Sequence, residues 1–335
     1  MAIVTNTFTH YSALGIREDL SNIIADISPE QTPFQSNIGS QDVSNTFFEW
    51  QTDSLASADD TARISGDDVS SFDATSATSR VGNYTQILRR TMIIEDNLED
   101  VDKAGRASEV AYQLAKKGKE LKRDVEKMCL ANNARAVGAT GTAPETAGLP
   151  AWTATNSSRG TGGADPTGDG TDAATDGTQR AFTEAMLKTV MQSAWTAGGE
   201  PSMLMVGAFN KTAVSAFSGI AAQRYQAPSD SPTTIIGTAD VYMSDFGALN
   251  VVANRFQRGR DAFVIDPEYA AIATLRPIQA VDLAKTGDAT KKMVLCESGL
   301  VVGGVADERI VLGNLCLRVT PQHGGDPGRH LRLVG

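Results

Sequence analysis

Residues 96–137 read DNLEDVDKAGRASEVAYQLAKKGKELKRDVEKMCLANNARAV. The stretch contains no proline and is rich in Ala, Leu, Lys, Glu and Arg, which are strong helix formers. Apolar or small residues recur at helical spacing, at Ala107, Val110, Ala111, Leu114, Gly118, Leu121, Val125 and Met128. Because Gly105 interrupts the pattern, we expect a main helix from about Arg106, roughly 45 Å long at ~1.5 Å per residue. Such a helix predicts a spine with one face on a sheet.

Charged residues four positions apart decorate the solvent side of this helix. Lys116 can pair with Glu120, and Lys122 with Glu126, which supports a helix weakly. The apolar stripe is too short and too rich in alanine and glycine for a committed coiled coil. We therefore favour a helix that packs on a sheet.

The composition is that of a globular protein. The chain has 335 residues, 41% hydrophobic and 21% charged, which allows one large or two ordinary domains. No apolar run reaches the ~18 residues of a membrane span, and the first residues lack the charged and apolar parts of an export signal. The net charge of −10 argues against broad nucleic-acid binding, which needs a basic surface.

The residues that usually carry chemistry are scarce. His10, His323 and His330 lie at the two ends of the chain, and no phosphate-binding loop, dinucleotide fingerprint, C-x-x-C or H-E-x-x-H occurs. Three cysteines, Cys129, Cys296 and Cys316, are too scattered for a disulfide scaffold or a zinc site and indicate reduced thiols. We therefore predict no catalytic, cofactor-binding or metal residue, and no enzyme.

The N-terminal part predicts an arm followed by a long hairpin. Residues 16–27 carry one apolar helical face, which Ser28-Pro29 ends, and residues 32–39 are expected to be extended. Residues 46–50 and 81–94 are rich in β-formers and predict two paired strands. Between them lies a polar stretch that is either a disordered surface loop or a two-stranded arm folded on a neighbouring subunit.

The part after the spine predicts a loop and then a compact α/β block. Residues 138–177 are dominated by Gly, Ala, Thr and Asp, and the spacing of Asp165, Asp169, Asp172 and Asp176 does not follow the EF-hand rule for calcium. Helices are expected at 180–197 and 210–217. Strands are expected at 203–206, 239–243, 249–252, 262–265, 270–275, 278–283, 293–302 and 310–319.

Three long strings carry a family resemblance: TFTHYSALGIREDLSNIIADISPEQTPF from Thr7, VDKAGRASEVAYQLAKKGKELKRDVEK from Val101, and NRFQRGRDAFVIDPEYAAIATLRP from Asn254. With the order of parts, they make the chain resemble the major capsid proteins of tailed bacteriophages, which have the Hong Kong 97-type fold. The likeness runs from Thr7 to about Lys292 and is weaker beyond. The implied fold is α+β, in this order: 1–45 N-terminal arm, 46–94 extended β-hairpin loop with its strand flanks, 95–179 peripheral domain with the spine helix, 180–275 axial domain, 276–320 returning strands of the peripheral domain, and 321–335 tail.

The resemblance also implies a function and partners. The chain is expected to self-assemble, through pentamers and hexamers, into an icosahedral shell that encloses double-stranded DNA without sequence-specific binding. Because the recognisable arm begins within ten residues of Met1, a separate scaffolding protein is expected, with a portal at one vertex; a decoration protein is left open. The expected location is the virion, after assembly in the host cytoplasm, with no membrane and no cofactor. The alternative is an intracellular, non-enzymatic ligand- or ion-binding protein with a mobile acidic loop.

Charge suggests how one subunit holds the next. Residues 51–80 contain six acids and two arginines, a net charge of −4, while residues 116–127 of the spine contain six bases and three acids, a net charge of +3. In the fold that the chain resembles, the extended loop lies across the peripheral domain of a neighbour. We therefore predict an inter-subunit contact between the acidic and the basic group, formed by Asp59, Asp60, Asp67 and Asp68 with Lys116, Lys119 and Arg123. Two merely solvated faces are the alternative, since exposed ion pairs contribute only ~0–1 kcal/mol each.

Overall fold

The computed structural model describes residues 30–217 (without 54, 57, 70, 71, 76 and 104), residues 240–303, and the backbone of residues 313–314. Two sheets and one separate hairpin organise this part of the chain. The helix predicted at residues 16–27 lies outside the described residues, and so do the three histidines and Cys316.

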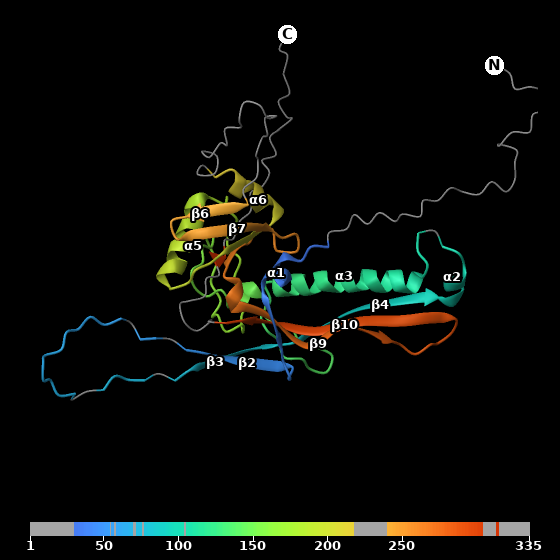
Figure 1. Cartoon of the computed structure of the whole chain (residues 1–335), viewed down its shortest axis with the longest axis horizontal. Coiled ribbons are helices and arrows are strands. Elements are labelled where there is room, and N and C mark those ends of the chain that lie inside the picture. The colour runs from blue at the N-terminus through green and yellow to red at the C-terminus, as the bar shows by residue number, and fades with distance from the viewer. Residues whose placement is uncertain are drawn as a thin grey trace, which may run out of the picture.

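The larger layer is a four-stranded sheet with a long helix across one face. Its strand order is β1 (Gly39–Asp42), β9 (Ala270–Asp282), β10 (Ala289–Val302) and β4 (Gln86–Glu95). Helix α3 (Glu109–Cys129) packs on β4 and β10, and the short α2 (Asp96–Asp100) lies at the far end (Figure 1). The predicted spine on a sheet is confirmed.

Helix α3 is shorter than the sequence pattern predicts. It has 21 residues, about 31 Å at ~1.5 Å per residue, and it begins at Glu109 rather than Arg106. Ser108 is its N-cap, because the Ser108 side chain accepts a hydrogen bond from the Ala111 N–H at 3.1 Å.

Tertiary contacts end α3 although its sequence would continue. After the cap at Leu130, Asn132 exchanges two hydrogen bonds with the backbone of Ala174, at 2.7 and 3.0 Å. The carbonyl of Asn133 accepts from the Gly148 N–H at 3.1 Å. These bonds direct the chain away from the helix axis. Satisfying buried backbone groups stabilises the fold more than the small helix propensity of a few extra residues would.

The predicted hairpin exists, but only residues 81–84 of its predicted second strand take part. Strand β2 (Phe47–Thr52) pairs antiparallel with β3 (Ser79–Tyr84), while β4 pairs with β10 in the larger sheet. The single strand predicted at 81–94 was therefore wrong. Thr85 separates the two strands; it is buried, and its hydroxyl donates to Glu297 at 2.8 Å.

The second sheet forms the α/β block. Its order is β11 (Gly313–Asn314), β8 (Ala262–Ile265), β5 (Met203–Val206), β7 (Gly247–Ala253) and β6 (Val241–Ser244). Helices α5 (Glu184–Thr196) and α6 (Ala208–Ser215) pack on this block, where Leu187, Val190 and Val214 are buried. The helices and strands predicted there are confirmed to within a few residues.

Strand β9 corrects the predicted end of the block. The strands expected at 270–275 and 278–283 are one strand, so the domain boundary drawn at 275 falls inside β9. Pro277 lies where the pairing with β10 shifts register, a position at which proline is tolerated because no ladder N–H is required. Of the strand expected at 310–319, the described part is β11, which joins the second sheet rather than the first.

Residues 32–39 of the arm were predicted to be extended. This prediction was wrong, because the described part of the arm starts with a short helix. Helix α1 (Pro33–Asn37) precedes β1, which pairs parallel with β9. Pro33 suits the first helical turn, where its missing N–H costs nothing.

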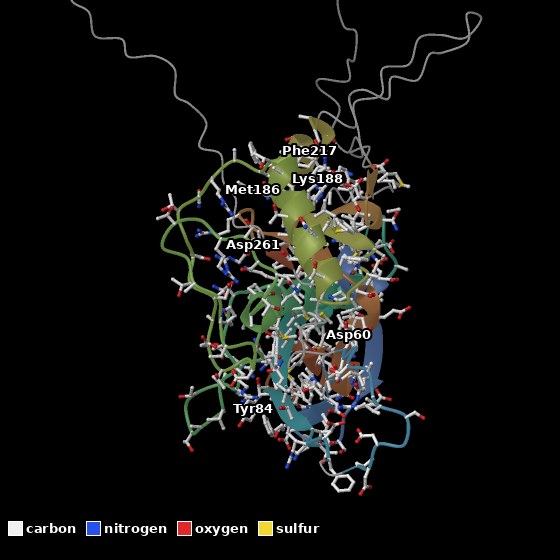
Figure 2. All side chains as sticks on the ribbon, turned by 90° about the vertical axis from the view of Figure 1, so that its left-hand side faces the viewer. Asp60, Tyr84, Met186, Lys188, Phe217 and Asp261 are labelled. Atoms are coloured by element: carbon white, nitrogen blue, oxygen red, sulfur yellow. The ribbon has the colours of Figure 1, made fainter. Side chains whose placement is uncertain are left out.

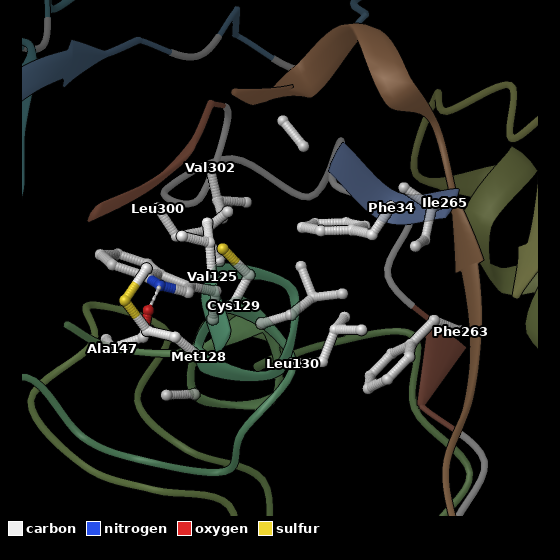
Figure 3. Packing of buried hydrophobic residues seen from close by; sticks show 14 of the residues in the cluster. Phe34, Val125, Met128, Cys129, Leu130, Ala147, Phe263, Ile265, Leu300 and Val302 are labelled. Atoms are coloured by element: carbon white, nitrogen blue, oxygen red, sulfur yellow. Dashed lines mark hydrogen bonds between the residues drawn. The ribbon is translucent and has the colours of Figure 1, made fainter. Parts of the chain in front are cut away.

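The main core lies where the spine ends. Phe34 of α1, Leu130 at the end of α3, and Phe263 and Ile265 of β8 belong to one buried cluster (Figure 3). Two short elements complete the described structure, α4 (Leu149–Trp152) and a 3₁₀ turn at Pro267–Tyr269. The core therefore joins the arm, the spine and both sheets.

Candidate inter-subunit surface

The acidic loop (residues 53–78) connects β2 to β3 and projects from the body (Figure 1). All of its described residues are exposed, including Asp59, Asp60, Asp67 and Asp68. Two hydrogen bonds from Thr61, the side-chain bond foremost, hold the pKa of Asp59 below its ordinary value. The four carboxylates are therefore open to a partner.

The acidic loop also carries apolar side chains, which its net charge does not reveal. Four large ones are exposed: Leu55 (79%), Ile64 (81%), Val69 (67%) and Phe72 (88%). Single exposed apolar residues are common, but four on one projecting loop make it a candidate contact surface. The signal was visible in the sequence as four large apolar residues within an otherwise polar stretch.

The base of the acidic loop is firmly attached. The buried side chain of Asn83 donates to the carbonyls of Leu300 at 2.8 Å and Ala147 at 3.3 Å, and it accepts from the Ala147 N–H at 2.9 Å. Trp50 on β2 packs against Trp152, with ring centroids 5.4 Å apart. A rigid base therefore carries an exposed tip.

The predicted basic residues lie on α3 but are not all free. Lys116 is exposed, whereas Lys119 forms an ion pair with Glu30 of the arm, and Arg123 is half-buried with an interaction of its own. Glu120 pairs with Lys117 at 2.8 Å, so the predicted Lys116–Glu120 pair was wrong. The pair predicted between Lys122 and Glu126 was also wrong, because Glu126 is buried and contacts the arm.

The structure does not bring the acidic and basic groups together within one subunit. The acidic loop projects beyond the β2–β3 end of the body, while α3 runs along the sheet towards α2 (Figure 1). Any contact between these groups therefore has to form between two chains.

The Gly/Asp loop (residues 156–178) holds its carboxylates against arginines and threonines. Asp165 pairs with Arg159, and Asp176 pairs with both Arg258 and Arg260. No group of three or more potential metal ligands occurs in the part of the chain that the structure describes. Buried Asp261 lies beside Arg258 at 3.4 Å, and burial foremost raises its pKa to about 6. Asp176, Arg258, Arg260 and Asp261 form a clasp that attaches the loop to the body.

Comparison with known proteins adds the family. The family model described as SU10 major capsid protein matches residues 3–310. The chain belongs to this family. The major capsid protein of Escherichia phage Phieco32 is 39% identical over 129 residues, which are 38% of this chain and 36% of that protein. The aligned part thus spans about a third of that relative.

Solved structures support the fold. The cyanophage A-1(L) capsid asymmetric unit has a TM-score of 0.65 at 12% identity, covering 90% of this chain and 96% of that one. A structure from Mycobacterium phage Adephagia has a TM-score of 0.59 at 12% identity, covering 91% and 96%. The predicted phage major capsid protein with a Hong Kong 97-like α+β fold is confirmed, and the ligand- or ion-binding alternative is set aside.

Proposed function

We propose that this capsid protein self-assembles, through pentamers and hexamers, into an icosahedral shell around double-stranded DNA, and that assembly is its only chemistry. The observation that carries the proposal is the acidic loop, whose exposed apolar side chains have no core to enter in their own subunit. Burying one such side chain against a neighbour contributes about 1.5–3 kcal/mol. Repetition around a closed shell multiplies this gain.

We propose that the acidic loop docks across the spine of a neighbour. Asp59, Asp60, Asp67 and Asp68 would face the basic side of α3, which carries Lys116, Lys119 and Arg123. Since Lys119 already pairs with Glu30, Lys116 is the residue best placed to receive a carboxylate. The charges select partner and register, and the apolar side chains supply most of the affinity.

The remaining expectations form part of the same proposal. The predicted order of the domains is arm, hairpin, peripheral domain and axial domain. A separate scaffolding protein, a portal at one vertex, an optional decoration protein and assembly in the host cytoplasm stay predictions. The net charge of −10 favours a container that does not grip its DNA, because DNA affinity would require basic contacts and would weaken steeply with salt. Among the described residues, none of the helices combines the length and the apolar character of a membrane-spanning segment.

Charge reversal tests the docking. Replacing Asp59, Asp60, Asp67 and Asp68 with lysine should leave the circular dichroism of the subunit intact but prevent shells from appearing in electron micrographs. Reversing Lys116, Lys119 and Arg123 to glutamate in the same chain should restore assembly in part. A loop variant that assembles as well as the parent at low and moderate salt would contradict the docking, while a parent that never assembles, with or without a scaffolding protein, would contradict the shell itself.

A further inference from the structure

Glu126 is a fully buried carboxylate on α3. Its Oε1 accepts hydrogen bonds from the backbone N–H of Phe34 and from Nδ2 of Asn254, both at 2.7 Å. Its Oε2 accepts a third bond from the backbone N–H of Gln35 at 3.0 Å. Donors from two other segments of the chain therefore meet on one side chain.

The two segments belong to different parts of the subunit. Phe34 and Gln35 lie in α1 of the arm, and the side-chain amide of Gln35 also donates to the Lys122 carbonyl at 2.6 Å. Asn254 directly follows β7, and its backbone N–H donates to the Val206 carbonyl at 2.8 Å. Glu126 thus joins the arm, the spine and the α/β block.

The hydrogen-bond donors that reach this carboxylate from other elements carry no charge. They are the backbone N–H groups of Phe34 and Gln35 and the side-chain amide of Asn254, which also contacts the Met205 sulfur. On α3 itself, the Lys122 carbonyl accepts the bond from Gln35. The pKa of the Cys129 thiol is raised, mainly by burial and then by the charge of Glu126. Burial raises the pKa of Glu126, and hydrogen bonds from Gln35, Phe34 and Asn254 oppose this shift.

We propose that Glu126 is a positioning residue for the arm: the closed junction sets the direction in which the arm leaves the spine, and it opens more readily when Glu126 is ionised than when it is neutral. Opening lets water reach the carboxylate and relieves the cost of a buried charge. The inference rests on the proposed function, because a shell places identical chains in different surroundings and a releasable arm can adapt to each.

Linkage fixes the direction of the pH effect. The pKa of Glu126 is raised above its ordinary value of 4.5 in the closed junction and returns towards that value when the junction opens. Proton binding therefore favours the closed junction. Its added stability is fully present below the ordinary pKa and is lost as the pH rises through the raised one.

Hydrogen exchange on the unassembled subunit tests the proposal. The protection of the backbone amides of residues 34–38, corrected for intrinsic exchange, should be lower at pH 7.5 than at pH 4.5, by up to about tenfold for each unit by which the pKa is raised. Glu126→Gln keeps one acceptor oxygen without the charge and should lose this pH difference. Amides of α5, which is remote from the junction, serve as the control.

A second variant keeps the test decisive if Glu126→Gln does not fold. Asn254→Ala removes one donor but keeps the carboxylate, so it should lower the protection at both pH values and enlarge the difference between them. Equal protection of the parent at both pH values, or an unchanged difference in Glu126→Gln, would overturn the proposal. Because no shell is needed, this result is independent of whether the parent assembles.

Discussion

Two loops of similar composition behave differently in this subunit. The acidic loop and the Gly/Asp loop are both rich in Asp, Thr and Ala. Asp60 of the first is exposed, whereas Asp261, beside the clasp that holds the second, is 1% exposed (Figure 2). Arg258 and Arg260 pair with Asp176 of the Gly/Asp loop and hold it against the body, and Arg159 pairs with Asp165 within the loop. The acidic loop instead extends away from the body, with its described residues exposed.

The difference lies in what each loop has to bury. The Gly/Asp loop contains no large apolar residue and satisfies its polar groups within the subunit, including paired backbone bonds between Ala164 and Thr175. The acidic loop carries exposed Ile64 and Phe72. Composition alone predicts two loops; the internal partners and the apolar side chains indicate that one is complete within the subunit and the other is not.

The largest expected effect concerns the apolar side chains of the acidic loop. Ile64→Ser combined with Phe72→Ser should change the free energy of unfolding by no more than ~0.5 kcal/mol, since both side chains are exposed. Assembly should need a subunit concentration more than ~100-fold higher, because each lost contact costs about 1.5–3 kcal/mol. Light scattering against concentration measures this, with Ala74→Ser as a matched control. Unchanged assembly would show that these side chains are not anchors.

Removing the arginines that hold the Gly/Asp loop should instead lower the stability of the subunit itself. Arg258→Ala with Arg260→Ala leaves Asp261 buried without its cation and should cost about 2–4 kcal/mol of unfolding free energy. Chemical denaturation measures it. Arg63→Ala, on the exposed acidic loop, is the control and should stay within ~0.5 kcal/mol. Equal losses in both variants would remove the distinction between the loops.

Two glycines give a closer comparison. Gly170 (φ +78°) and Gly66 (φ +84°) both have left-handed backbones, but a Cβ at Gly170 would lie 2.8 Å from the Trp152 ring, whereas a Cβ at Gly66 meets nothing within 4 Å. Gly170→Ala should therefore cost about 2–3 kcal/mol, from overpacking and backbone strain together. Gly66→Ala should cost only about 1–2 kcal/mol, from backbone strain alone. Thermal unfolding of the two variants should rank them in this order.

The smallest effect is the pH dependence of the clasp. The pKa of Asp261 is raised to about 6 from an ordinary 3.8, so its contribution favours the folded state at low pH and is lost as the pH rises through about 6. Asp261→Asn should remove on the order of 1–2 kcal/mol of pH dependence between pH 4.5 and 7.5. Unfolding at both pH values measures it, and identical slopes in parent and variant would refute the assignment.

Some features of this protein follow from the sequence alone. The spine between Glu109 and Cys129 and the strands at 203–206 and 262–265 are predictable, because hydrophobic periodicity and short buried apolar runs are local signals. The family resemblance supplied the capsid fold. The exposure of the acidic side chains in the projecting loop could also be predicted, because residues 53–78 are too polar to form a core of their own.

Other features were decided by the tertiary structure. The end of α3 depends on contacts of Asn132 with residues some forty positions away, and the separation of β3 from β4 depends on pairing with β10. Glu126 has the spacing of a solvent-side ion pair, yet α1 of the arm and Asn254 enclose it. A local pattern reports the preference of one element, whereas burial and hydrogen-bond partners are set by which distant segments the fold brings against it.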